Sequence, residues 1–384
     1  MLLKRLLPFF IIGILNMSCN KLFIKPDGVS EPEKNFEIFW NDINNGYPYF
    51  VEDNINWKDR YKEFKPQITS STSIPQLFNY MTKMLSGFSD GHLSVEYQGD
   101  SYSNEKRGPI SAQIVKNDGS ETLVTTLDVY YYRHFYRINQ LYLDPDTYVV
   151  KKATNGIQND NEDTVCIYGY RQQDKILYIN ITSFLTQYRF DNLLTEIFNL
   201  YPDSKGLILD LRMNGGGNLA TMWNAMSVFM PSGVSEVRYA FNKEKVGPLP
   251  ENFGAETYFA INANYFQTTF SQPIVVLANR LTVSAAEHAV LAMREINKIR
   301  QKKIKIIGDY TYGATSFIVE RTLPCGIQYT LVNNKTTDIN HNIIERTGVR
   351  PDEFSYITAS KITEANNPDD QMNKAIELIN TNAF

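Results

Sequence analysis

Apolar residues recur every three or four positions in two stretches near the start of the chain, which predicts two amphipathic helices. They are Phe36, Phe39, Trp40 and Ile43 in the first stretch, and Leu77, Met81, Met84 and Leu85 in the second. We therefore expect residues 35–92 to form a small helical domain. Near the end of the chain, the run DQMNKAIELIN predicts a surface helix within residues 361–384.

The middle of the chain changes to short stretches in which apolar and polar residues alternate, as in ISAQIV and TLVTTLDVYYY. Turns rich in Asn, Asp and Gly separate these stretches, so residues 93–164 are expected to be a mostly β segment. Residues 165–360 then alternate strand-like runs such as KGLILDLRM with helix-like runs such as SAAEHAVLAMREI. This alternation predicts an α/β core.

The first residues have the character of an export signal. A cationic start precedes an apolar run of about ten residues, which is too short for the roughly 20 residues of a membrane-spanning helix. Cys19 follows, as at a bacterial lipoprotein cleavage site, so we expect residues 1–19 to be a signal peptide that ends at a lipidated Cys19. Residues 20–34 would then be a linker. The alternatives are a plain cleaved signal or an uncleaved anchor, and in each case the protein leaves the cytoplasm.

The composition narrows the class of protein. The formal net charge is −4 over 384 residues, without a block of like charges, so we expect no nucleic-acid partner. The 24 tyrosines and 22 phenylalanines indicate aromatic core packing, although exposed tyrosines can also line a groove. Cys166 and Cys325 are expected to be buried free thiols rather than one disulfide, and no Cys or His spacing suggests zinc.

A glycine-rich turn follows one of the predicted strands. The apolar run 207–211 leads into Arg212, Asn214 and then Gly215, Gly216 and Gly217. Glycines at the end of a strand expose backbone N–H groups that can bind a phosphate or an oxyanion. The spacing fits neither a P-loop nor a dinucleotide fingerprint, and an ordinary tight turn is the alternative. Arg212 and the preceding Asp210 are expected to be structural.

A serine stands at the start of a later helix. The strand-like run 274–278 is followed by a short polar loop and by a helical pattern that begins near Ser284. The amides and the dipole of a helix N-terminus stabilise negative charge, which makes Ser284 a candidate nucleophile. The alternative is an ordinary helix cap, because Glu287 three residues later completes a capping box.

Together, the run DLRMNGGGN and the later strand followed by SAAE resemble the tail-specific (C-terminal processing) peptidase family. The resemblance implies that Ser284 is the nucleophile and that Gly216, Gly217 and the amide of Ala285 form the oxyanion hole. Fixed N–H donors of this kind are commonly the largest single catalytic contribution. The resemblance also implies a crotonase-like α/β core preceded by an N-terminal helical cap domain.

One position departs from the family pattern. IIGDYTYGATS resembles the family's G-E-x-T-x-G-K segment, but Ala314 stands where the bacterial processing enzymes have their lysine base. SGFSDGHLSVEY resembles the D-G-H segment of the tricorn-like and retinoid-binding-protein-like branch, which implies His92 as the base instead. IIERTGVRPDEF resembles the family's E-x-x-G-V-x-P-D segment, which implies Glu345 as the supporting carboxylate. The ordinary histidine pKa of about 6.5 suits a general base.

The other histidines have structural interpretations. His288 lies one turn beyond Ser284 on the same predicted helix, where a nucleophile and its base rarely align. His134 lies in a tyrosine-rich strand and His341 in a polar turn. For His92 itself, the alternative is a buried histidine that closes the turn before it.

These observations predict a serine-type endopeptidase that acts on extracytoplasmic polypeptides through an acyl-enzyme and needs no metal or organic cofactor. A normal PDZ domain is not expected, because residues 98–164 lack the carboxylate-binding loop that such a domain uses. The main alternative is a catalytically inactive lipoprotein on the same scaffold that binds peptide, lipid or glycan. A further alternative is acyl transfer on a substrate that is not a peptide. We expect the protein to be membrane-anchored and to face the periplasm or the cell surface.

Overall fold

The computed structural model describes nine ranges of the chain. They are residues 31–103, 113–115, 121–123, 138–154, 162–185, 188–263, 269–301, 303–356 and 368–384. The predicted signal peptide, the lipidation site Cys19, most of the linker and His134 lie outside them. Within these ranges, no helix combines the length and the apolar character that crossing a bilayer requires.

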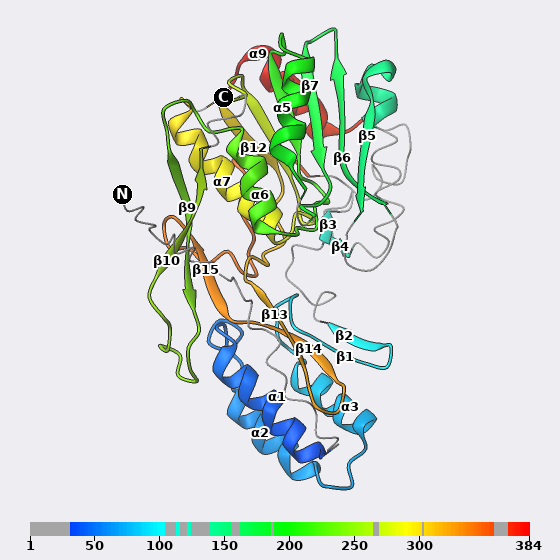
Figure 1. Ribbon diagram of the computed structural model, residues 1–384, viewed down its shortest axis with the longest axis vertical. Helices are drawn as coiled ribbons and strands as arrows, with labels where there is room; N and C mark the ends of the chain where they lie inside the picture. Colours follow the sequence, from blue (N-terminus) through cyan, green and yellow to red (C-terminus); the bar gives the residue numbers. More distant parts are fainter. Residues whose placement is uncertain are drawn as a thin grey trace, which may run out of the picture.

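A seven-stranded sheet forms the centre of the larger part of the molecule (Figure 1). From one edge to the other its strands are β16 (Glu353–Phe354), β12 (Ile304–Gly308), β11 (Ile274–Ala278), β8 (Gly206–Asp210), β7 (Ile176–Ile181), β6 (Glu162–Arg171) and β5 (Val149–Thr154). The first five run parallel, and β6 and β5 run antiparallel to their neighbours. Every residue of β7, β8 and β11 is buried, as expected for strands that are covered on both faces.

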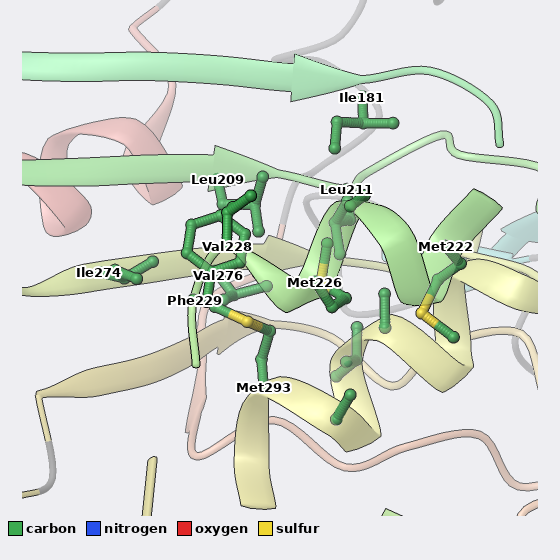
Figure 2. Close-up of a cluster of buried hydrophobic side chains, with 14 of the residues drawn as sticks. Ile181, Leu209, Leu211, Met222, Met226, Val228, Phe229, Ile274, Val276 and Met293 are labelled. Carbon is green, nitrogen blue, oxygen red and sulfur yellow. The ribbon is translucent and has the colours of Figure 1, made fainter. Parts of the chain in front are cut away.

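Helices cover both faces of this sheet. Helices α5 (Phe190–Leu200), α6 (Leu219–Ser227) and α7 (Ala285–Ile299) pack on one face, and α9 (Asp370–Thr381) packs on the other. Along β11, Ile274 and Val276 belong to the first core, while Val275 and Leu277 belong to the second. Figure 2 shows Val276 in the first core, close to Phe229 and Met293. The predicted mixed α/β fold is confirmed.

Both amphipathic stretches near the start of the chain form helices. Helices α1 (Pro32–Gly46), α2 (Trp57–Phe64) and α3 (Ile74–Met84) surround a separate core at the lower end of the molecule (Figure 1). The side chains predicted to face this core are buried, except for Trp40, which is partly exposed. The short helix η1 (Lys65–Gln67) follows α2.

Strands from a distant part of the sequence complete this helical core. Its sheet has the order β13 (Ile318–Thr322), β14 (Gln328–Val332), β1 (Ser94–Tyr97) and β2 (Asp100–Ser103). β14 pairs antiparallel with β1, with Val95 opposite Tyr329. The N–H of Cys325 also donates to the side-chain oxygen of Asn35 in α1 at 3.1 Å. The core under the N-terminal helices therefore depends on residues that lie beyond α7 in the chain.

A third sheet lies beside α7 and extends toward the helical end (Figure 1). Its strands are β10 (Thr257–Asn262), β9 (Glu236–Glu244) and β15 (Asn334–Asp338), all antiparallel. The remaining described elements are the hairpin of β3 (Gln113–Val115) and β4 (Glu121–Leu123) and the short helix η4 (Pro145–Thr147). Cys166 is buried and Cys325 half-buried, and both are free thiols as expected.

Candidate active site

The loop between β11 and α7 holds Ser284 in a strained backbone conformation. Its φ is 56° and its ψ is −121°, a region that residues other than glycine rarely adopt. Ser284 directly precedes α7, so the N–H of Ala285 belongs to the first helical turn and has no acceptor within the helix. The predicted nucleophile therefore lies beside an amide that can donate to a ligand.

The glycine-rich loop after β8 packs directly against Ser284. A Cβ atom placed on Gly216 would lie 2.7 Å from the Cβ of Ser284 and 3.1 Å from the amide nitrogen of Ala285. Gly216 and Gly217 have φ values of 97° and 125°, which favour glycine. The structure thus brings together the four residues that were predicted to form the nucleophile and the oxyanion hole.

Asn214 fixes the position of this glycine loop. Its side-chain oxygen accepts the N–H of Gly216 at 2.9 Å, and its side-chain nitrogen donates to the carbonyl of Ile181 at 2.9 Å. Its own carbonyl accepts the N–H of Val283, next to the nucleophile, at 2.9 Å. The N–H of Gly216 is therefore already hydrogen-bonded within the loop. The N–H groups of Gly217 and Ala285 remain as the candidate donors to an oxyanion.

The side chain of Glu287 holds the strained turn at Ser284 in place. Its Oε2 accepts the N–H groups of Ser284 and Ala314 at 3.0 and 2.8 Å, and its Oε1 accepts the N–H of Gly313 and the hydroxyl of Thr311, both at 2.6 Å. Burial raises the pKa of Glu287 to about 7, although these four donors favour the ionised form. The carboxylate thus does more than cap the helix, since it joins the nucleophile loop to residues 311–314.

Ala314 lies beside the nucleophile. Its N–H and that of Ser284 donate to the same oxygen of Glu287. The position that resembles the family's lysine is therefore adjacent to Ser284 in space, and it carries only a buried methyl group. A lysine base cannot act from this position, so a base must come from elsewhere.

The predicted base and its carboxylate lie together. One nitrogen or oxygen atom from each of Asp90, His92 and Glu345 lies within 4.8 Å of the other two. Glu345 is 1% exposed, and its Oε2 accepts the N–H groups of Thr315 and Ser316 at 2.9 and 3.1 Å. The structure thus places His92 and Glu345 close together, and it adds Asp90, which was not predicted.

Burial controls the charge of this cluster. It lowers the pKa of His92 to about 4, so the imidazole is neutral at ordinary pH. Burial and the nearby carboxyls of Asp90 and Glu287 raise the pKa of Glu345 well above its usual range. A neutral histidine is the form that a general base requires.

A single loop connects the two halves of the candidate site. Residues 311–314 donate hydrogen bonds to Glu287, which also accepts the N–H of Ser284. The next two residues, Thr315 and Ser316, donate to Glu345. The nucleophile turn is therefore linked, through Glu287 and the backbone of residues 313–316, to Glu345, which lies beside His92.

The other described histidines have structural surroundings. The Nε2 of His288 lies 2.9 Å from the carbonyl oxygen of Thr315, and its ring packs edge-on against Phe259 with centroids 5.0 Å apart. His341 is exposed and stacks on Phe241. Both agree with the structural interpretation.

Arg212 also has a structural role, as expected. It is fully buried and forms ion pairs of 2.7 Å with Asp210 and with Asp369, the residue that caps α9. The network joins the end of β8 to the helix on the far face of the sheet. It thereby holds the strand from which the glycine loop departs.

Sequence reasoning missed three residues of the site. Asp90 and Asn214 belong to the motifs DGH and RMNGGGN. Their role in the site was not predicted, because it depends on contacts with loops that are distant in sequence. Glu287 was identified only as a capping residue, because a local capping pattern does not show the donors that come from residues 311–314.

Comparison with known proteins agrees with this geometry. Residues 175–354 match peptidase family S41. The C-terminal processing peptidase of the chloroplast of Tetradesmus obliquus is 28% identical over 152 residues, or 38% of this chain, and this chain spans 28% of the length of that curated relative.

Two solved structures share the fold. A candidate peptidase from Parabacteroides merdae ATCC 43184 has a TM-score of 0.70 at 23% identity, over 91% of this chain and 97% of that one. Mature CPAF has a TM-score of 0.61 at 10% identity, over 92% of this chain and 98% of that one. Both sequence matches are therefore to peptidases.

Proposed function

Because residues 175–354 match peptidase family S41, we propose that the protein is a serine endopeptidase that cleaves extracytoplasmic polypeptides through an acyl-enzyme. One observation carries the proposal. Ser284 is held at φ 56° directly before α7, against Gly216 and beside the amide of Ala285. Backbone strain of this kind persists where the surroundings impose it, and it is concentrated at functional sites.

Acylation begins with proton transfer to His92. The neutral imidazole accepts the proton of the Ser284 hydroxyl while Oγ forms a bond to the carbonyl carbon of the substrate. The carbonyl oxygen becomes negatively charged and accepts N–H groups from Ala285 and Gly217. Glu345 stabilises the imidazolium that has formed.

Release of the first product returns this proton. The carbon–nitrogen bond of the substrate breaks, and His92 gives its proton to the departing amine, which leaves an ester on Ser284. A water molecule then attacks the ester carbonyl while His92 accepts its proton. The carbon–oxygen bond to Ser284 breaks, and the proton passes to Oγ, which regenerates the enzyme. No metal or organic cofactor takes part in these steps.

The departure at Ala314 supports a histidine base. A methyl group there cannot accept a proton, whereas the burial of His92 keeps the imidazole neutral. The same departure also supports the second candidate function, a catalytically inactive protein that binds peptide, lipid or glycan. Reaction of Ser284 with an electrophile separates the two.

The scaffold and the location are part of the proposal. We assign residues 165–360 to a crotonase-like core and the N-terminal helices to a cap domain. Lipidation of Cys19 would anchor the body by the linker 20–34, facing the periplasm or the cell surface. Metabolic labelling with a fatty acid tests the anchor: the native chain should be labelled and found with membranes, and the Cys19→Ala chain should not.

The deciding experiment is reaction of the purified full-length chain with a fluorophosphonate probe, read by intact mass. We expect one adduct per native chain and none on Ser284→Ala or His92→Ala. The exposed His341 provides a matched control, and His341→Ala should react like the native chain. Absence of an adduct on the folded native chain would favour the binding protein, and an adduct on Ser284→Ala would refute the assigned nucleophile.

A further inference from the structure

Three side chains in the candidate site have buried polar atoms without a hydrogen-bond partner. They are Oδ2 of Asp90, Nδ1 of His92 and Oε1 of Glu345. Asp90 and Glu345 are each 1% exposed. Buried polar atoms are nearly always paired, so three unpaired atoms in one cluster indicate that a partner belongs there.

Other atoms of the three residues are already hydrogen-bonded. The backbone N–H of His92 donates to Oδ1 of Asp90 at 2.8 Å, and Oε2 of Glu345 accepts the N–H groups of Thr315 and Ser316. One ligand atom from each of the three residues lies within 4.8 Å of the other two. The cluster therefore offers one imidazole nitrogen and two carboxylate oxygens that lie close together, and each of the three residues also has a buried atom without a partner.

We propose that Asp90, His92 and Glu345 bind a divalent transition-metal cation of the zinc type. Two carboxylates neutralise its charge, and one imidazole with two carboxylates is a donor set that suits zinc or its neighbours. Tetrahedral ligand atoms at about 2.1 Å from a shared zinc ion are about 3.4 Å apart, so the three atoms, which now lie within 4.8 Å of one another, would each approach the others by at most about 1.4 Å on binding. Magnesium and calcium prefer all-oxygen sites and fit less well.

The cation would switch off the proposed peptidase, an inference that rests on the proposed function. A metal on Nδ1 of His92 occupies that lone pair, so the proton of the neutral ring moves to Nε2. The ring then cannot accept the proton of Ser284. Glu345, which would stabilise the imidazolium, is occupied by the same ion. Removal of the ion by a chelator frees both His92 and Glu345, so the inhibition is reversible.

Calorimetric titration with zinc chloride tests the site directly. The full-length Ser284→Ala chain, freed of metal with EDTA and dialysed, is used so that binding is measured without catalysis. We expect one zinc ion per chain and no binding of magnesium. In the same background, His92→Gln, Asp90→Asn and Glu345→Gln should each weaken zinc binding at least tenfold.

Matched controls exclude loss of fold and surface binding. Each variant must retain the circular-dichroism spectrum and a cooperative thermal transition; where one ligand variant does not fold, the other two decide. His341 lies 3.7 Å from Glu256 on the surface, so His341→Ala tests the competing surface site and should leave zinc binding unchanged. Absence of binding, or binding that survives in the folded ligand variants, overturns the proposal.

A second measurement separates this inference from the proposed function. Zinc should slow fluorophosphonate labelling of the native chain at least tenfold, and EDTA should restore the rate. If the chain is never labelled but binds zinc through the three residues, the peptidase assignment fails and the site stands. If the chain is labelled and zinc does not bind, the metal site alone is refuted.

Discussion

Gly216 and Ser284 approach so closely that a single methyl group on the glycine would lie 2.7 Å from the Cβ of the serine. The same methyl group would lie 2.8 Å from the carbonyl oxygen of Val283, and the φ of Gly216 is 97°. The nucleophile turn and the glycine loop are therefore fitted to each other with no space for a side chain.

Replacing Gly216 by alanine should displace Ser284. We expect the rate of fluorophosphonate labelling to fall at least about 100-fold, because a shift of about 1 Å at reacting atoms has an effect of this size. Gly215→Ala is the matched control, since a Cβ there meets nothing within 4 Å. Equal labelling of the two variants would show that the contact with Gly216 does not position the nucleophile.

Glu287→Gln should disturb the nucleophile turn and lower stability. The glutamine amide has one oxygen in place of two, so its NH₂ group faces at least one of the four donors that now bind the carboxylate. We expect a loss of about 1–3 kcal/mol in the free energy of unfolding, measured with urea, together with slower labelling. The exposed Glu320→Gln serves as control, and equal stability of both variants would contradict the role given to Glu287.

His288→Gln should lower stability while leaving the chemistry in place. The ring fills a buried space against Phe259 and lies 2.9 Å from the carbonyl oxygen of Thr315, so its loss should lower the free energy of unfolding by about 1–3 kcal/mol. The folded fraction should still be labelled at Ser284, as intact mass can report. Complete loss of labelling in folded protein would make His288 a candidate base.

Fluorophosphonate labelling of Ser284 should remain fast at unusually low pH. A histidine acts as a general base only when it is neutral, and burial lowers the pKa of His92 to about 4, below the ordinary 6.5. In the Glu287→Gln chain, which lacks the carboxyl whose pKa burial raises to about 7, the rate constant should therefore change little as pH falls from 6.5 to 5 and should decline as pH falls through about 4. Circular dichroism at each pH checks that the chain is folded. A decline centred near pH 6.5 in the folded chain would show that His92 titrates normally or is not the base.

Local patterns in the sequence predicted the elements that carry the nucleophile. The buried runs of β8 and β11 and the helix after Ser284 are where periodicity and turn residues placed them. These features depend on residues that are close in the chain, such as the glycines after β8. The same is true of the apolar faces of α1 and α3.

The remaining features depend on long-range contacts. The residue spacing around β1 does not indicate that this strand pairs with β14. It also does not indicate that the side chain of Asn214 accepts the N–H of Gly216. Glu287 has the same local pattern whether it caps a helix or gathers donors from residues 311–314. Sequence spacing therefore identified the catalytic candidates but not the network that holds them.

The pairing of β1 with β14 also sets the order in which the candidate site is assembled. During synthesis, His92 leaves the ribosome well before β14 and Glu345, and the chain folds progressively from its N-terminal side. A nascent chain therefore has neither the strand that completes the core near His92 nor the carboxylate beside it. The candidate site is therefore complete only after the chain has been made through Glu345, although the helices around His92 come from its N-terminal part.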